Sequence, residues 1–468
     1  MEWYWILSLL LGSILFLMFV GVPIGIAFIF VNSIAAFFLY GRFESFDANV
    51  AASIGQLTDN AFANMAIFAI VPIPMFLLMG ELFFHSGLAK RMFDAIENLM
   101  GSTPARLSYV TVAGGTAFAT LSGSSMGSTA LLGTLMVPEM EERGYDKSMS
   151  IGPILGTGGL AMLIPPSALA VLLGTLAELD IGKLLIAGVV PGLILATMYA
   201  LLIYVRVTLK PSLAPSYDVK RISWLIRIKY FLVDVVPMVS IIFLVILLIM
   251  FGVATPSESA AYGSLGVVIL SFIYLLIIPW LQGDRKQVKI FWPNFKRAMW
   301  KSMWGASRVT IIALMILFGS SLFSNVLAGS GASVKLIEWV TSYEISGLGM
   351  LMVMFGILLF LGMFMDQLAM MLLTVPIFFP IMAGFDLGMG PEKQVIWFAV
   401  IMLLAMEISF TTPPFGLLLF VMQGVAPPGT RFIEICLAAV PFMLCAMALV
   451  ALIIIFPSIT TWLPFLTK

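Results

Sequence analysis

Long apolar runs alternate with short polar stretches along nearly the whole chain. In the first half they lie near residues 3–20, 23–40, 65–84, 148–179 and 183–205. An apolar run of about 20 residues is long enough to cross roughly 30 Å of hydrocarbon as a helix. The pattern predicts an all-α polytopic membrane protein. The first run, in MEWYWILSLL, lacks a basic start and a small-residue cleavage site, so we expect it to be a retained span.

One polar stretch interrupts this pattern inside an apolar region. Ser122–Ala130 reads SGSSMGSTA, and only about 30 residues separate Arg106 from Pro138. That length suits two half-length helices rather than two full spans. We therefore expect a re-entrant hairpin with Ser122–Ser125 at its tip. The alternative is a helix-packing face, because Gly123 and Gly127 form a GxxxG motif.

Short motifs of the first half recur in the same order in the second. MVPEMEERGYD (136–146) is similar to FFPIMAGFD (378–386), and LIPPSA (163–168) is similar to TTPPFG (411–416). A Val-Pro pair follows each Pro-Pro pair about 25 residues later. Five spans per half would make the second copy enter from the opposite side. This order predicts an inverted-topology repeat of two five-span halves, each with a re-entrant helical hairpin and a Pro-broken helix, as in elevator-type transporters.

The repeat sets the expected boundaries. The first repeat covers 1–205, with an arm at 41–60, a hairpin at 106–138 and a broken helix at 148–179. A cytoplasmic linker covers 206–229. The second repeat covers 230–468, with an arm at 284–305, a hairpin at 347–382 and a broken helix at 393–426.

The hairpin tips and helix breaks supply the candidate binding residues. Aligning Pro138 with Pro380 places Ser124 opposite Asp366, which predicts a second tip in GMFMDQLA. Proline pairs free backbone carbonyls, and nearby Ser and Thr add oxygen ligands suited to an alkali cation. The expected ion and substrate residues are Ser122, Gly123, Ser124, Ser125, Gly156, Gly158, Pro165, Ser167, Asp366, Gln367, Thr411, Thr412 and Pro413. Sodium is expected at Ser122, Ser124 and Gly158, and at Asp366, Thr411 and Thr412.

Composition narrows the class of function. Mean hydropathy is +1.10 and only 10% of residues are charged, which excludes a soluble core for the whole chain. There is one histidine, the two cysteines lie nine residues apart, and no phosphate-binding GxxxxGK[ST] loop occurs. We therefore expect no ATP-driven pump, no enzyme, no cofactor beyond coupling sodium ions, and no nucleic-acid partner.

Charge predicts the orientation in the membrane. Six Lys and Arg fall in 206–229 and seven in 282–308, with one acid in each stretch. The positive-inside rule makes both stretches cytoplasmic. Counting spans then predicts a periplasmic N-terminus and a periplasmic C-terminus. Bases alternate with Trp and Met in 293–308, as in an interfacial helix.

Acids inside apolar runs are further candidates, because membrane-embedded acids are costly. Glu258 lies in TPSES, at an expected helix start, where it can act as a cap. Glu407 precedes the TTPP break by four residues and is a candidate for lining the second ion site.

These motifs together resemble the large membrane subunit of TRAP (tripartite ATP-independent periplasmic) transporters, from about Gly21 to Pro441. The match includes SGSS, PEMEERGYD, LIPPSA, GVATPSESAAYG and TTPPFGLLLFV. The resemblance implies a sodium-coupled symporter of the bacterial inner membrane with an elevator mechanism. It further implies a small four-helix membrane subunit, a periplasmic substrate-binding protein, and small organic acids as substrates. No extra helices precede the first span, so we expect the small subunit to be a separate chain.

Three alternatives remain open on the sequence. A binding-protein-independent sodium/dicarboxylate symporter, or another ion-coupled carrier, would share this architecture. A passive channel could use the polar tips as a filter. The third alternative is a purely structural membrane protein. It has the least support from the sequence, since such a role gives no reason for polar tips at membrane depth.

Overall fold

The computed structural model describes the chain except for residues 1–2, 41–45, 66–69, 102, 216–222, 343–344, 364, 414–415 and 467–468. The described part contains helices and no strands. Six of its helices are long and apolar enough to cross a membrane, or seven if the bent pair of α4 and α5 is one span. Four shorter helices, α1, α2, α17 and α18, are also apolar. The described chain thus has the make-up of a multi-pass membrane protein.

The helices of the first half are α1 (Trp3–Phe19), α2 (Ile24–Tyr40), α3 (Phe46–Met65), α4 (Pro72–His85), α5 (Leu88–Met100), α6 (Arg106–Ser122), α7 (Ser125–Glu142), α8 (Lys147–Gly159), α9 (Ala168–Leu176) and α10 (Ile181–Leu209). Those of the second half are α11 (Trp224–Tyr230), α12 (Val236–Met250), α13 (Pro256–Phe272), α14 (Ile278–Leu281), α15 (Arg285–Gly329), α16 (Ala332–Thr341), α17 (Gly347–Leu361), α18 (Gln367–Ala383), α19 (Pro391–Phe410), α20 (Leu417–Val425), α21 (Phe432–Ile455) and α22 (Ser458–Thr461).

Polar side chains start many of these helices inside otherwise apolar sequence. The side chain of Asp180 accepts from the Lys183 amide at the start of α10, and Ser346 caps α17 in the same way. Thr255 and Glu258 form a capping box that opens α13. Each cap satisfies backbone donors that the first turn leaves free. Glu258 therefore serves as a helix cap.

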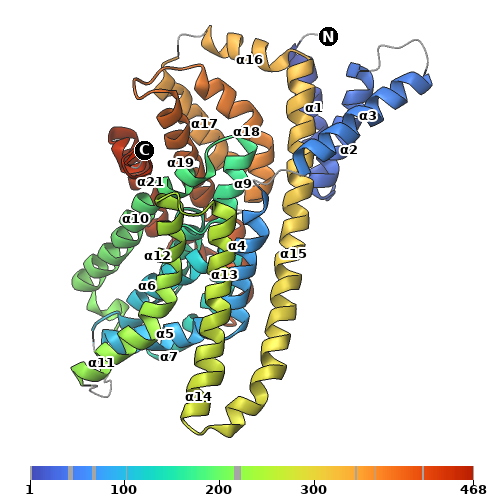
Figure 1. Ribbon diagram of the computed structural model, residues 1–468. Helices are drawn as coiled ribbons and strands as arrows, with labels where there is room; N and C mark the ends of the chain where they lie inside the picture. Colours follow the sequence, from blue (N-terminus) through green and yellow to red (C-terminus); the bar gives the residue numbers. More distant parts are fainter. Residues whose placement is uncertain are drawn as a thin grey trace.

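The long helix α15 dominates one side of the molecule (Figure 1). It runs for 45 residues without a break, through Pro293, so the expected arm 284–305 continues directly into the span that follows it. Gly305 ends the expected arm, and an isolated glycine can either stop a helix or lie within one, so the sequence does not show that the arm continues into the span. Of the first arm, 41–45 lies outside the described residues and the rest is the start of α3. Of the expected linker, 206–209 continues α10 and 216–222 lies outside the described residues.

Packing partners recur between the halves. By order in the chain, α2 corresponds to α13 and α4 to α15, and α2 packs on α15 while α13 packs on α4. In the same way α8 packs on α21 while α10 packs on α19. Ion pairs follow this exchange: Lys147 at the start of α8 meets Glu434 of α21 at 2.7 Å, and Lys183 of α10 meets Glu392 of α19.

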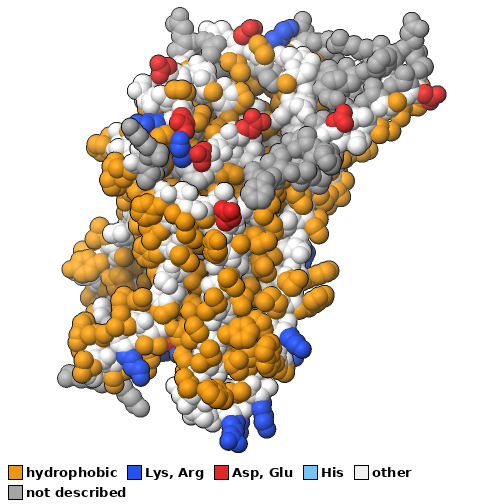
Figure 2. All heavy atoms as spheres, in the orientation of Figure 1, with side chains coloured by type: hydrophobic (Ala, Val, Ile, Leu, Met, Phe, Trp, Pro, Cys, Tyr) orange, Lys and Arg blue, Asp and Glu red, His pale blue; other side chains and the backbone are white. Residues whose placement is uncertain are grey.

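The surface fits a membrane setting. Figure 2 shows apolar side chains over most of the middle of one face, with Lys and Arg at the end formed by α14 and the start of α15. Large apolar side chains such as Phe16, Phe38 and Leu225 are strongly exposed. Exposed apolar surface on this scale marks contact with lipid or with other proteins.

Candidate functional site

The first hairpin turns at Gly123, between α6 and α7. Gly123 has a φ of +60°, a left-handed conformation that favours glycine, and its amide donates to the Ala119 carbonyl at 2.9 Å. Ser124 then begins α7, and its Oγ accepts from the Gly127 amide at 3.1 Å. The half-buried Ser124 hydroxyl thus already serves as a helix cap.

Buried hydroxyls line the inner face of this tip. Ser122 Oγ and Ser128 Oγ lie 2.8 Å apart. Ser125 Oγ and Thr129 Oγ1 are buried and have no hydrogen-bond partner among the described residues. Ser125, Ser128 and Thr129 are spaced to share one face of α7. A buried hydroxyl without a partner costs about 1–3 kcal/mol, so this face favours a ligand that would engage those oxygens.

Two glycines bring other elements against the first hairpin. A Cβ added to Gly80 of α4 would lie 2.4 Å from Ser122 Cα and 2.5 Å from the Leu121 carbonyl oxygen. A Cβ on Gly158, near the end of α8, would lie 2.4 Å from Thr129 Oγ1. Both distances are too short for a real side chain. The absence of a side chain at both positions therefore lets α4 and α8 reach the hairpin.

The first break lies against the same tip. After α8, a 3₁₀ turn at Leu160–Met162 leads to Pro165 and Pro166, and Ser167 caps α9 by accepting from the Ala170 amide at 3.2 Å. The Cβ position of Gly123 is 3.9 Å from the Pro166 carbonyl oxygen. The structure therefore brings together Ser122, Gly123, Gly158 and the Pro165–Ser167 turn. Gly156 instead faces Phe442 of α21.

The second tip is built from different side chains. Asp366 begins α18, and its Oδ1 accepts from the Ala369 amide at 2.8 Å. Gln367 is 5% exposed, and its Nε2 has no partner among the described residues. A Cβ on Gly362, at the end of α17, would lie 2.0 Å from Ser409 Oγ on α19. The second hairpin thus rests against the end of the second broken helix.

The second break follows at once. Thr411 Oγ1 and Thr412 Oγ1 both donate to the Ile408 carbonyl, at 3.0 and 2.7 Å. Pro413 lies in the turn that follows, residues 414–415 lie outside the described part, and α20 begins at Leu417. Thr412 Oγ1 also lies 3.4 Å from Met443 Sδ. Because a hydroxyl has a single hydrogen to donate, the oxygens of both threonines keep acceptor capacity for a cation.

Sequence reasoning missed several side chains at these contacts. Thr129 lies four residues after Ser125, so helical spacing could have suggested it. Gly80 and Ser409 carry no such signal, because their importance comes from a partner far away in the chain. Glu407, which the sequence did suggest as a candidate, lies one turn before the second break and contacts Gly159 at the end of α8, so it links the two halves.

The chemistry of these residues favours hard, monovalent ligands. In the part of the chain that the structure describes, no group of three or more His, Cys, Asp or Glu could hold a metal ion. The first tip offers hydroxyl and carbonyl oxygens, which suit an alkali cation and do not suit a transition metal. The second tip adds a carboxylate and an amide N–H.

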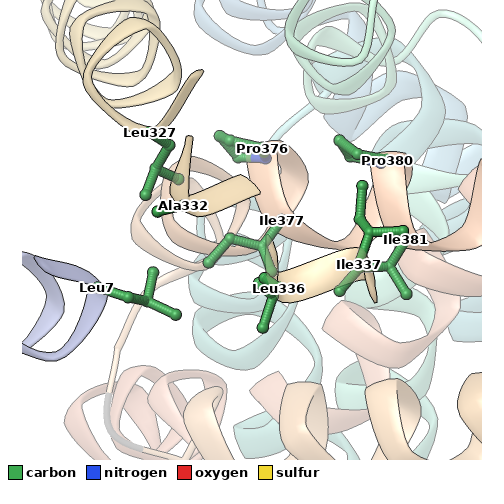
Figure 3. Close-up of a pocket in the computed structure, with 9 residues that line it drawn as sticks. All are labelled: Leu7, Leu327, Ala332, Leu336, Ile337, Pro376, Ile377, Pro380 and Ile381. Carbon is green, nitrogen blue, oxygen red and sulfur yellow. The ribbon is translucent and has the colours of Figure 1, made fainter. Parts of the chain in front are cut away.

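An apolar pocket elsewhere on the second hairpin has no such chemistry. It is a gap of about 10 Å³ where α18 meets α16 and the ends of α1 and α15. Figure 3 shows Pro376, Ile377 and Pro380 of α18 facing Leu336 and Leu7 across it. Because every side chain around the gap is apolar, it is a packing surface between the hairpin and its neighbours.

Comparison with known proteins places these features in a family. A protein-family model described as the DctM component of the tripartite ATP-independent periplasmic transporter matches residues 11–459. The C4-dicarboxylate TRAP transporter large permease protein DctM of Pseudomonas aeruginosa is 30% identical over 416 residues, covering 88% of this chain and 90% of that protein.

Two further matches widen the comparison. The isethionate TRAP transporter permease protein DctMQ of Oleidesulfovibrio alaskensis is 28% identical, covering 98% of this chain and 65% of that longer protein. The crystal structure of the YdaH transporter of Alcanivorax borkumensis matches with a TM-score of 0.58 and 12% identity, covering 89% of each chain. At that identity the likeness concerns the fold alone.

Proposed function

The chain belongs to the family of DctM components of tripartite ATP-independent periplasmic transporters, and we propose that it is the large permease subunit of a sodium-coupled importer of small organic acids. Its relatives are transporter permeases, which are not enzymes. The observation that supports the sodium coupling is the pair of buried hydroxyls of Ser125 and Thr129, which have no partner among the described residues, with Thr129 Oγ1 against Gly158 near the end of α8.

The first sodium site uses Ser122, Ser124 and Gly158, with Ser125 and Thr129 as additional ligands. Hydroxyls and freed carbonyls at a helix break are the groups that hold sodium in transporters of this kind. The second site uses Asp366, Thr411 and Thr412. Its support is the location of both threonines at the end of α19, with Asp366 on the hairpin that packs there.

Substrate binds between the two tips, near the meeting point of the halves. The Gln367 amide is a buried donor without a partner, and it suits a carboxylate oxygen. Relatives named for C4-dicarboxylate and isethionate carry small organic acids, and we extend that class to this chain.

The mechanism we propose is an elevator built on an inverted repeat. The repeated element order and the exchanged pairs, α2 with α15 and α13 with α4, support two related halves. The hairpins and broken helices move together across the remaining helices. The side chains that line the gap between α18 and α16 are all apolar, which supports this movement.

The protein works in the bacterial inner membrane with a separate small four-helix subunit and a periplasmic substrate-binding protein. Both chain ends lie in the upper part of Figure 1, away from the basic turn between α14 and α15. That arrangement supports periplasmic N- and C-termini, because the positive-inside rule makes the basic end cytoplasmic.

Uptake into proteoliposomes tests the proposal. The chain, its small subunit and its binding protein are reconstituted, and uptake of a labelled C4-dicarboxylate is measured with and without an inward sodium gradient. We expect uptake to require both sodium and the binding protein. Thr129→Val should raise the sodium concentration needed for half-maximal uptake, while Thr134→Val, at an exposed hydroxyl on the same helix, should leave it unchanged.

Two results would contradict it. Uptake indifferent to both sodium and the binding protein would indicate a passive channel. Uptake that needs sodium but not the binding protein would instead favour the binding-protein-independent symporter.

A further inference from the structure

A pocket lies where α15 packs on α4, away from the proposed ion sites. It has a volume of about 530 Å³ and is lined by Glu81 and His85 of α4 and by Trp300, Lys301, Trp304, Gly305 and Arg308 of α15. The lower half of α15 forms the right-hand edge of the molecule in Figure 1. A ligand can therefore reach the pocket from the membrane around the helices.

The pocket carries two bases that pair with no acid among the described residues. Lys301 and Arg308 are exposed, and neither takes part in the ion pairs of the described chain. The acid that lines the pocket is already engaged. Glu81 Oε2 lies 3.2 Å from His85 Nε2, and a Cβ on Gly305 would lie 2.8 Å from Glu81 Cδ. An anionic ligand would thus meet two cations that have no other partner.

Both bases belong to one stripe of α15. Lys301, Trp304 and Arg308 are spaced by three and four residues, so they share a face of the helix. Three residues further on, the same stripe reaches Ile311, which is 58% exposed. A long arginine side chain can extend its charge back toward the membrane surface. The stripe therefore offers positive charge at one end and apolar surface at the other.

The side chains around the bases are too bulky for a second helix to approach closely. Trp300 and Trp304 are each 69% exposed, and Met303 is 50% exposed. Helices that pack together in a membrane favour small residues at their contact. Tryptophan is instead enriched where the membrane meets water. This face suits a lipid better than a helix of another protein.

We propose that the pocket binds the headgroup of an anionic phospholipid from the cytoplasmic leaflet. The lipid phosphate accepts hydrogen bonds from Lys301 and Arg308, and one acyl chain follows the helix past Ile311. Basic pockets between membrane helices on the cytoplasmic side bind such headgroups. Because side chains of both helices line the pocket, the bound lipid stabilises the packing of α4 on α15.

The inference goes beyond the proposed transport and rests only on the orientation given above. The positive-inside rule assigns the basic start of α15 to the cytoplasm, where the anionic lipids of the inner leaflet face the bases.

Quenching of tryptophan fluorescence by brominated lipids tests the proposal. The full-length chain is placed in phosphatidylcholine bilayers, and brominated phosphatidylglycerol or brominated phosphatidylcholine is added. The signal of Trp300 and Trp304 is the difference between a protein and its Trp300→Phe/Trp304→Phe version. We expect half-maximal quenching of this signal at a roughly tenfold lower mole fraction of the anionic lipid.

Charge variants show whether the preference belongs to the pocket. Lys301→Gln/Arg308→Gln should remove it, whereas Lys301→Arg/Arg308→Lys keeps both charges and should retain it. Lys286→Gln/Lys289→Gln makes the same change in charge at the start of α15, outside the pocket, and should also retain it. A preference that survives Lys301→Gln/Arg308→Gln, or that both glutamine variants lose equally, would overturn the proposal.

Salt provides a second measurement on the wild type if Lys301→Gln/Arg308→Gln does not fold. Screening weakens the attraction between exposed charges, so the preference should shrink as the salt concentration rises. A preference that salt leaves unchanged would contradict the inference.

The small subunit is the other candidate occupant of this face. If its addition abolished quenching of Trp300 and Trp304 by both lipids, the face would belong to that partner and the lipid site would be refuted. Quenching by phosphatidylglycerol that persists in the assembled complex would support the lipid. None of these measurements involves uptake, so a failure of the transport proposal remains distinguishable.

Discussion

The two halves make the same close contact from opposite sides. In the first half, Gly158 lies on the broken helix and faces Thr129 on the hairpin. In the second, Gly362 lies on the hairpin and faces Ser409 on the broken helix. The two contacts are alike in geometry, a glycine against a hydroxyl side chain, and differ in which helix supplies each. A motif comparison therefore finds the Pro pairs but not this contact.

The tips also differ in how they are supported. Gly80 of α4 presses on the backbone of Leu121 and Ser122 at the first tip, whereas Gly362 at the second meets only side chains. Backbone at the first tip cannot move aside without disturbing the turn, whereas Ser409 Oγ and Met370 Cε near Gly362 can rotate away and only Ser409 Cβ is held in place. The first tip should therefore tolerate change less well than the second.

Gly80→Ala should have the largest effect. Its Cβ would collide with the backbone of both Leu121 and Ser122, so we expect a loss beyond the roughly 3 kcal/mol that overpacking usually costs. Thermal unfolding of the purified protein in nanodiscs measures it. Gly356→Ala, on a helix with open space around the Cβ position, is the control and should be neutral. A mild Gly80→Ala would refute the difference between the tips.

Gly158→Ala and Gly362→Ala should follow, at about 1–3 kcal/mol each. The second is repairable: Ser409→Gly removes the atoms that an added Cβ would strike, so the double variant should regain much of the lost melting temperature. Adding Ser409→Gly to Gly158→Ala should give no such recovery. Recovery in both backgrounds would mean that Ser409 acts generally and not through Gly362.

The two roles of the Asp366 side chain, as helix cap and as charged cation ligand, can be tested separately. Asp366→Asn keeps a good N-cap for α18, so stability should change little, but the proposed cation ligand loses its charge and sodium dependence should weaken. Asp366→Ala should also lose about 1 kcal/mol of stability. Asp386→Asn, at an exposed acid after the same helix, serves as the control. Sodium dependence unchanged in Asp366→Asn would make Asp366 a cap only.

The two ion pairs between the halves, Lys147 with Glu434 and Lys183 with Glu392, should contribute least to stability. Exchanging the charges of Lys147 and Glu434 keeps the pair, as does exchanging those of Lys183 and Glu392. Partly exposed pairs of this kind contribute little, so each double exchange should leave the melting temperature close to that of the wild type. A large loss in only one of them would show that the two pairs are not equivalent.

The sequence predicted the parts of this arrangement that local chemistry determines. Pro165 and Pro413 each begin a Pro-Pro pair, and these pairs and the run at Ser122–Ser125 favour helix breaks, so the breaks and turns could be located in advance. The continuity of α15 through Pro293 could not, because a proline inside a helix is tolerated when the rest of the helix packs well. Nor could Gly80, Thr129 or Ser409, since their contacts depend on tertiary packing between distant segments.

The residues of the candidate site could likewise be predicted only in part. The tip hydroxyls followed from composition, but Ser124 is occupied as a cap, and the unpartnered oxygens belong to Ser125 and Thr129. Which hydroxyl stays free depends on the face of α7 that Gly158 approaches, and no pattern of residues reveals that.

Sodium binding by the purified chain tests the central claim most directly. Thermal unfolding in nanodiscs is followed as sodium replaces potassium at constant ionic strength, for the wild type and for Ser125→Ala/Thr129→Val. A ligand that binds only the folded state raises the melting temperature, by an amount that grows with the logarithm of its concentration relative to its Kd. We predict that sodium, and not potassium, stabilises the wild type and that the double variant loses this stabilisation. Equal stabilisation of both proteins by sodium would contradict the assignment of the first tip as a sodium site.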